Sequence, residues 1–470
     1  MTEKDHTSLL EGNISSIIWR NSQPMFMAIL LLLMYELLES GLIALSSTAT
    51  LTAFGFTVPI TAAMTALAVG TSIRCNNKVV KSACLEKNNL SQNISLTLLT
   101  SALTLLIMTI LALTFSEQLL SLLGNNNWLS TEYIINGQQL AAEQSSYINN
   151  RYFTWLFLGA VWQINGILRA LNFTQLASNI MVAWVVLKAS LALLLLLPQS
   201  PWYYDSLVAL SLIHAISDIS FTLISCYILH KKVKLSWPSV KAFKTQCNQP
   251  KLTSFLVIGQ QLITPLSLAI LTIIAASYNH TYVAAFALIF KLEAIILLIP
   301  MALTTSMPAI IGFNYWTGHH DRVKQAYRYM FATVLIAQLV IALVLNYTVD
   351  FWANSLCPHD SVTIHLKHYL TWLPWGYIGA GCVIVYQSTL NAKDKAINAS
   401  VLGIIHRLLL LIPLAWFGFS DGEYSLYPAL MLGHLFAGVS VLYLFRKASI
   451  IKIRTIPIKE QLATYSKRIN

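Results

Sequence analysis

Residues 25–47 read MFMAILLLLMYELLESGLIALSS, an apolar run whose charged side chains are Glu36 and Glu39. About 20 helical residues cross a bilayer core of about 30 Å, so this run predicts a transmembrane helix. Eleven more segments of similar length and hydropathy follow, and the sequence therefore predicts an all-α integral membrane protein with twelve transmembrane helices. The predicted spans are 25–47, 51–72, 92–115, 153–171, 176–197, 206–229, 253–277, 282–306, 328–349, 368–390, 397–417 and 425–445.

The Lys and Arg residues divide unevenly between the two sides of the predicted membrane. With the N-terminus placed in the cytoplasm, 25 of the 30 fall in cytoplasmic loops or tails, and only Arg151 and Lys367 fall in the opposite loops. This bias predicts that both termini are cytoplasmic. The net charge of +11 is explained by basic loops that face an anionic leaflet, so we expect no nucleic-acid partner.

A weak internal repeat predicts two halves of six spans each. Residues Leu171–Ala177 resemble Leu390–Ala396 at an offset of 219, which would also make Lys188 equivalent to Arg407. Both halves begin inside, so we expect parallel repeats with substrate at their interface. The predicted parts are a cytoplasmic segment 1–24, an N-lobe 25–229, a basic linker 230–252, a C-lobe 253–445 and a basic tail 446–470.

Charged and polar side chains inside the spans are the candidate functional groups, because a charge at the centre of a membrane helix costs roughly 2.5 to 3.5 kcal/mol. Glu36 and Glu39 are three residues apart and so share one face of the first helix with Tyr35. The candidate residues for binding protons or substrate are Tyr35, Glu36, Glu39, Asn165, Lys188, Asp218, Lys291, Glu293 and Arg407.

Each candidate has an alternative interpretation. Glu39 is either a carboxylate that takes up a proton from outside and releases it inside, or a member of a static ion pair. Lys188 either neutralises Glu39 or presents an ammonium to substrate, while it and Arg407 could also simply pair with a buried acid. Asp218, with His214 four residues before it, is either part of a proton relay or a packing position.

Signatures of enzymes, cofactor sites and metal sites are absent from the sequence. It contains no phosphate-binding glycine loop, no His-Glu-x-x-His helix and no Gly-x-Ser-x-Gly turn. The adjacent His319 and His320 cannot easily face one metal ion. We therefore expect a protein that is not an enzyme and has no cofactor, and any work it does must come from an ion gradient.

Several short motifs resemble the multidrug and toxic compound extrusion (MATE) transporters. The stretch Gly312–Val323, GFNYWTGHHDRV, is similar to the turn that ends the eighth helix of that family, and Lys291-Leu292-Glu293 is similar to the Arg-x-Glu of its DinF-like branch. Leu168–Leu171 and Ser388–Ala392 resemble the turns before helices five and eleven. Aligning Tyr35-Glu36-Leu37-Leu38-Glu39 with the family's first helix puts Glu39 on the position of a proton-linked Asp.

The resemblance implies an antiporter of two six-helix bundles in a bacterial inner membrane, a monomer that exports drug-like, commonly cationic organic compounds in exchange for protons. Sodium coupling stays open. The alternative within the superfamily is a lipid-linked saccharide flippase or an exporter of anionic metabolites, which Lys188, Lys291 and Arg407 favour. Three features depart from the family pattern: Lys188 stands where an Asn is common, Ala192 stands where a second acid can occur, and the helix-two turn Gly70-Thr71-Ser72 lacks the usual Gly-Ala-Gly sequel.

Overall fold

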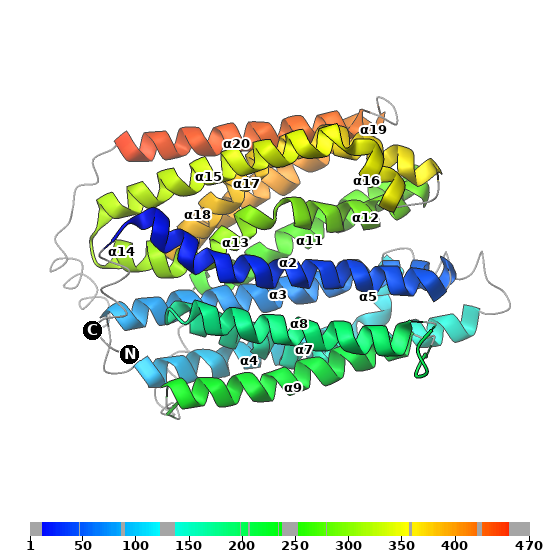
Figure 1. Cartoon of the computed structure of the whole chain (residues 1–470), viewed down its shortest axis with the longest axis horizontal. Coiled ribbons are helices and arrows are strands. Elements are labelled where there is room, and N and C mark those ends of the chain that lie inside the picture. The colour runs from blue at the N-terminus through cyan, green and yellow to red at the C-terminus, as the bar shows by residue number, and fades with distance from the viewer. Residues whose placement is uncertain are drawn as a thin grey trace.

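The described part of the chain is built from helices joined by short turns (Figure 1). The computed structural model describes residues 12–46, 48–85, 90–122, 137–197, 199–204, 207–233, 235–236, 252–278, 280–356, 360–420 and 425–450. Most of the predicted basic linker and all of the tail beyond residue 450 lie outside these residues.

The described residues of the first half form six long helices and one short one. They are α2 (Ile14–Ser46), α3 (Thr48–Leu85), α4 (Leu90–Thr114), the short α5 (Ser116–Leu122), α7 (Gly137–Ala170), α8 (Thr174–Leu196) and α9 (Leu207–Val233). Each of the first six predicted spans overlaps one of the long helices. Helices α2 and α7 begin well before the predicted starts, at Ile14 and Gly137.

The second half repeats this arrangement with more interruptions. Its elements are α11 (Leu252–Tyr278), α12 (His280–Ile296), α13 (Leu298–Met307), the π-helical turn η2 (Pro308–Gly312), α14 (Phe313–Trp316), α15 (His320–Tyr347), α16 (Val349–Leu356), α17 (Asp360–Ala392), α18 (Ala396–Ile404), the π-helical turn η3 (Ile405–Leu411), α19 (Ile412–Ser420) and α20 (Leu426–Ile450). The last six predicted spans overlap α11, α12 with α13, α15, α17, α18 to α19, and α20.

Length and hydropathy identify nine membrane-crossing helices among the described residues, and the bent pair α12 and α13 makes ten. The other two predicted spans fall on α7 and α17, which are more polar but have 34 and 33 residues. A helix of that length is about 50 Å long, more than a bilayer core requires. The architecture confirms the prediction of an all-α membrane protein.

A proline explains the bend of 55° between α12 and the helical stretch that begins at Leu298. Pro300 has no N–H and cannot bond the carbonyl of Ile296, four residues earlier. The side-chain amide of Gln338 on α15 instead donates to the Ile296 carbonyl oxygen over 2.9 Å. The broken span is therefore stabilised by a neighbouring helix rather than by its own backbone.

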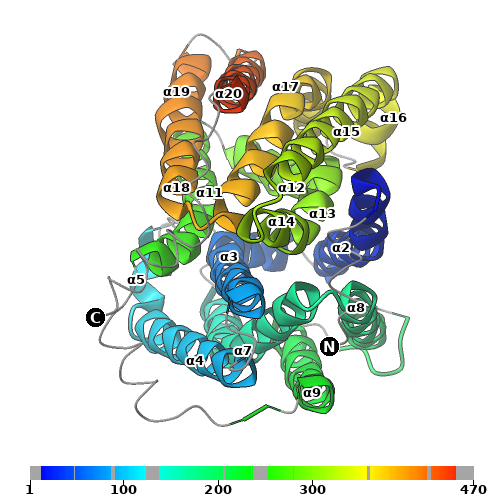
Figure 2. The same cartoon turned by 90° about the vertical axis from the view of Figure 1, so that its left-hand side faces the viewer.

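The helices form two groups that follow the two halves of the chain. Figure 2 views them end-on: α4, α7, α8 and α9 lie on one side, α15 to α20 lie on the other, and α2 and α3 lie along the seam between the groups. Helix α2 packs on α8 of its own half and on α13 of the other, and α3 packs on α7 and α11. The limits of the two lobes stay a prediction.

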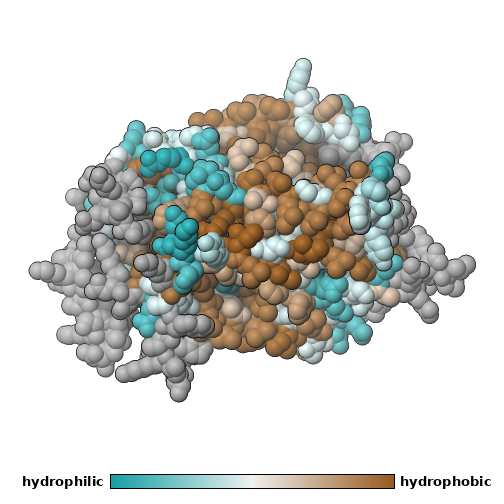
Figure 3. Space-filling view, turned by 60° about the horizontal axis from the view of Figure 1, so that its bottom comes forward, coloured by the Kyte–Doolittle hydropathy of each residue, from teal (hydrophilic) through white to brown (hydrophobic). Residues whose placement is uncertain are grey.

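The surface has the distribution that a membrane protein needs. Figure 3 shows hydrophobic residues across the middle of the visible face and hydrophilic residues towards its ends. Helix α2 begins and α20 ends at the same end of the molecule (Figure 1), as an even number of crossings requires. The assignment of that end to the cytoplasm stays a prediction.

The internal repeat is real in geometry, but its predicted register is wrong by three residues. The α7–α8 and α17–α18 turns each have a left-handed residue, Asn172 (φ 63°) and Asp394 (φ 60°), which differ by 222 in number. The surrounding backbone hydrogen bonds follow the same offset, since Phe173 N donates to Leu168 O and Lys395 N donates to Leu390 O. An offset of 222 places the equivalent of Lys188 near Leu410, so Lys188 and Arg407 are not equivalent positions.

Candidate functional site

Five charged or ionisable side chains from four helices meet inside the first half. Glu39 Oε2 on α2 lies 3.4 Å from His214 Nε2 on α9, and the other ring nitrogen, Nδ1, lies 3.2 Å from the ammonium of Lys188 on α8. That ammonium lies 2.9 Å from Asp218 Oδ1, and Asp218 Oδ2 lies 3.6 Å from Arg151 on α7. We call these five residues the N-half network.

Helix geometry explains why one helix supplies two members of the network. His214 and Asp218 are four residues apart on α9 and therefore lie on the same face. Trp184, one turn before Lys188 on α8, donates its Nε1–H to Asp218 Oδ1 over 3.0 Å, and its ring lies 4.0 Å from the Lys188 ammonium. The aromatic ring and the carboxylate together hold the lysine against α9.

All five members of the network are buried: Asp218 is 0% exposed and Glu39, the most exposed, is 8%. Two carboxylates face two cations, so the network is formally neutral when His214 is neutral. Burial of a charge is tolerated only when it is paired, and removal of one partner leaves a strongly destabilising charge. Loss of any one charge in the N-half network therefore leaves another buried charge uncompensated.

Arg151 is the member that the sequence analysis missed, because it placed this residue in an outer loop. Helix α7 begins at Gly137, which puts Arg151 inside the helix. The segment before residue 153 is rich in Gln, Asn and Ser, so its mean hydropathy hides the helix. The signal was periodicity: Tyr147, Ile148, Arg151 and Trp155 recur at helical spacing, and all of them are buried.

The expected direct pair between Lys188 and Glu39 is not formed. His214 lies between them and contacts both. The carboxylate partner of Lys188 is Asp218. Tyr35, on the same helix as Glu39, is buried with its ring edge-on to His214, at 6.2 Å between centroids. Tyr35, Glu39, Lys188 and Asp218 are therefore brought together as candidates, with His214 at their centre.

Glu36 and Lys291 lie at the seam between the two groups of helices. The ammonium of Lys291, on α12 of the second half, donates to the backbone carbonyl oxygen of Glu36 on α2 over 3.1 Å. Both residues are partly exposed, unlike the N-half network. Among the described residues, no ion pair within 4.0 Å involves the Glu36 carboxylate or the Lys291 ammonium. These two oppositely charged side chains therefore lie close to the same backbone carbonyl group, and neither has an ion-pair partner within 4.0 Å among the described residues.

The two remaining charged candidates pair with each other in the second half. Arg407 on η3 donates to Glu293 Oε1 on α12 over 3.0 Å. Next to Arg407 in sequence, His406 Nε2 lies 3.0 Å from His434 Nδ1 on α20. The pairing of Arg407 with an acid matches one of the alternatives predicted for it.

Comparison with known proteins supports the resemblance found in the sequence. Residues 257–417 match the MatE family model. The predicted resemblance to MATE transporters is confirmed, while the DinF-like branch stays a prediction.

Similar proteins match this chain along almost its whole length. An FAD transporter of Shewanella oneidensis is 26% identical over 458 residues, covering 94% of this chain and 97% of the relative. The fold is shared with a point mutant of the Vibrio cholerae MATE transporter VcmN (TM-score 0.81, 21% identity) and with a MOP superfamily transporter of Pyrococcus furiosus (TM-score 0.81, 16% identity). Each structural match covers 95% of this chain and 98% of the other.

Asn165 is the candidate that lies apart from the N-half network. Its side-chain amide donates to the Ala177 carbonyl oxygen over 2.7 Å and so ties α7 to α8. Gln387 makes the matching bond to Ala399 in the second half. Asn165 is 14 residues after Arg151 on α7, about 21 Å along the helix. Asn165 therefore stabilises the packing of α7 on α8 beside the turn that joins them.

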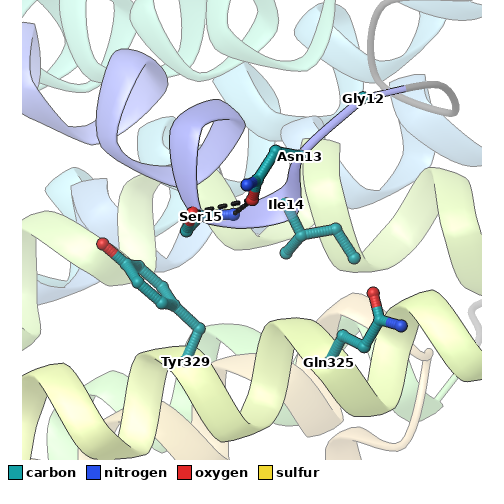
Figure 4. Close-up of a pocket in the computed structure, with 6 residues that line it drawn as sticks. All are labelled: Gly12, Asn13, Ile14, Ser15, Gln325 and Tyr329. Atoms are coloured by element: carbon teal, nitrogen blue, oxygen red, sulfur yellow. Dashed lines mark hydrogen bonds between the residues drawn. The ribbon is translucent and has the colours of Figure 1, made fainter.

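A pocket of about 410 Å³ opens where α2 begins, between residues Gly12–Ser15 and Gln325 and Tyr329 of α15 (Figure 4). Asn13 Oδ1 accepts hydrogen bonds there from the backbone N–H and the hydroxyl of Ser15. Glu39 is 25 residues further along α2 than Ile14, about 37 Å away along the axis. This pocket is therefore separate from the N-half network.

Proposed function

We propose that this chain is a transporter of the MATE type, a secondary antiporter that exports an amphipathic organic compound while protons enter, by alternating access of its two groups of helices. The observation that carries the proposal is the N-half network itself. Its contacts lead without interruption from Glu39 through His214 and Lys188 to Asp218 and Arg151. A static ion pair would need only two of these five residues.

The direction of the hydrogen bonds gives Glu39 its role. The Lys188 ammonium can only donate, so the Nδ1 atom of a neutral His214 accepts and the proton lies on its Nε2, the ring nitrogen 3.4 Å from Glu39 Oε2. An ionised Glu39 carboxylate completes this series of donors and acceptors. A protonated Glu39 presents an O–H to the Nε2–H instead, so uptake of a proton weakens the contact between α2 and α9.

Release of α2 from α9 is the step that we link to transport. Helix α2 packs on both halves, through α8 and α13, so its position affects how the halves meet. Substrates of parallel-repeat transporters bind between the repeats. A proton on Glu39 then favours one arrangement of α2 and its loss the other, which couples proton entry to substrate exit.

For the substrate class we propose a flavin nucleotide or a compound of similar size and polarity. Support comes from the Shewanella oneidensis relative, which is named as an FAD transporter and matches this chain from end to end. An amphipathic cation is the second candidate. The partly exposed and unpaired Glu36 carboxylate favours it, because a carboxylate attracts a cation.

Purified protein in proteoliposomes tests the proposal. Vesicles that are acidic inside should accumulate external FAD in exchange for protons, and parallel vesicles with ethidium or with a sodium gradient test the other substrate class and coupling ion. Glu39→Gln should bind substrate but lose accumulation driven by the pH gradient. The control is Asp350→Asn, which removes an exposed carboxylate from the Lys367 pair and should accumulate substrate normally. Accumulation by Glu39→Gln at the wild-type rate would show that Glu39 does not carry the proton.

A further inference from the structure

Most of the candidate charged residues inside the helix bundle pair with one another, but Glu36 and Lys291 do not. Lys188 and Arg151 face Asp218, His214 faces Glu39, and Arg407 faces Glu293. Glu36 and Lys291 meet at the seam, where the Lys291 ammonium bonds the Glu36 backbone carbonyl oxygen, and neither side chain has an ion pair within 4.0 Å among the described residues. Both side chains are partly exposed, so a ligand can reach them.

The depth of the two residues fits a substrate position. Glu36 is 10 residues from Ser46, where α2 ends, and Lys291 is 11 residues from His280, where α12 begins. Both distances correspond to about 15 Å along a helix, which is half of a bilayer core. Transporters built from two parallel repeats bind substrate near this depth at the repeat interface.

The position of the Lys291 ammonium is fixed from one side. It donates to the Glu36 backbone carbonyl oxygen over 3.1 Å, and the Phe54 ring of α3 lies 5.8 Å away. An ammonium has three N–H donors, so two remain. The neighbouring Glu36 carboxylate offers acceptors only. A ligand between them meets a donor and an acceptor side by side.

We propose that Glu36 and Lys291 form a two-point site for the edge of a planar heteroaromatic ring that carries an N–H next to a carbonyl, as in a cyclic imide. The ring N–H donates to the Glu36 carboxylate, and the adjacent ring carbonyl accepts from Lys291. This inference rests on the proposed function and names the part of the substrate that it recognises. The flavin ring of FAD has such an edge.

Simple ions fit this site less well. A phosphate has acceptors for Lys291 but is repelled by Glu36 and by the nearby Glu39. An organic cation is attracted by Glu36 but repelled by Lys291. A ring edge with both a donor and an acceptor satisfies the two groups together. Protonation of Glu36 replaces a charge-assisted hydrogen bond by a weaker one, so protons and ring compete for the site.

A pair of flavins that differ by one methyl group tests the site. Lumiflavin has the imide edge without ribityl or phosphate groups, and 3-methyllumiflavin has the ring N–H replaced by N–CH₃. Binding to the full chain in lipid nanodiscs is measured by quenching of flavin fluorescence. Wild type should prefer lumiflavin by about tenfold or more, the usual effect of a hydrogen bond to a charged group.

The variants locate that preference. Glu36→Leu should reduce the preference to less than about twofold, Glu36→Gln should retain part of it, and Lys291→Met should weaken both flavins by about tenfold. Asp350→Asn, on the exposed ion pair with Lys367, is the matched control and should bind both flavins as wild type does. Elution volume and melting temperature confirm that each variant is folded.

Other outcomes overturn the inference. Equal wild-type affinity for the two flavins, or an unchanged preference in folded Glu36→Leu, excludes the two-point site while leaving flavin transport in place. A wild-type protein that binds ethidium but neither flavin excludes the proposed substrate class as well. Proton coupling is read separately from the Glu39→Gln vesicles, so each failure is distinguishable.

Discussion

The two halves of this chain share a backbone plan but handle buried charge differently. In the first half, five ionisable side chains from α2, α7, α8 and α9 form one connected network. In the second half, Arg407 and Glu293 form a separate pair, and His406 bonds His434. A connected network transmits a change of charge from one helix to another, whereas a closed pair holds two helices together. We therefore expect transport to depend on the first and stability on both.

Asp218→Asn should have the largest effect, because it leaves Lys188 and Arg151 as two buried cations without their shared carboxylate. Loss of one partner of a buried ion pair costs about 3 to 5 kcal/mol. Thermal unfolding in detergent should show a markedly lower melting temperature. The double variant Asp218→Asn/Lys188→Met restores formal neutrality and should regain much of the loss. A double variant no more stable than the single one would argue against the charge explanation.

Glu293→Gln makes the corresponding change in the second half. Arg407 then loses its carboxylate, and we expect a smaller loss of about 3 kcal/mol, since both residues are slightly exposed. Replacing both by Met should be close to neutral in melting temperature, because well-packed apolar residues can substitute for a buried pair. The double variant should also keep gradient-driven transport. Loss of coupling in this folded variant would give the second half an active role.

His214→Gln and His406→Gln compare the two histidine contacts directly. The first removes the link between Glu39 and Lys188, and gradient-driven uptake should fall by about a hundredfold with little change in stability, a typical loss for a group that handles a proton. The second removes one member of the second-half histidine pair, and uptake should stay within about twofold of wild type. Initial rates in proteoliposomes check both, and equal losses would erase the proposed difference between the halves.

Asp394→Asn should have the smallest effect on stability. Asp394 lies 2.9 Å from Lys81 of α3 and so joins the two halves at the end where α2 begins, but both side chains are partly exposed. Such pairs contribute about 0 to 1 kcal/mol. Melting temperature should hardly change relative to wild type. A drop as large as that of Glu293→Gln would mean that this end of the seam is more tightly closed than the exposure of the pair indicates.

The sequence predicted part of the candidate site well. Glu39, Lys188 and Asp218 stand out because charges in apolar helices are rare, and the structure brings all three together. Arg151 was missed because a helix with Asn and Ser on its exposed side has low hydropathy. The equivalence of Lys188 with Arg407 failed because a short, weak match between Leu171–Ala177 and Leu390–Ala396 does not fix a register. Backbone geometry fixes it, through the left-handed Asn172 and Asp394.

The sequence by itself determined the membrane class, the spans and the resemblance to MATE transporters, because hydropathy and short motifs are local properties of the chain. Only the tertiary structure decided that Lys188 pairs with Asp218 rather than Glu39. It also decided that Glu36 and Lys291 meet at the seam without forming an ion pair within 4.0 Å among the described residues. Pairing depends on which helix faces meet and at what depth. Residues that are over 250 positions apart, such as Glu36 and Lys291, become neighbours only when the two halves pack together.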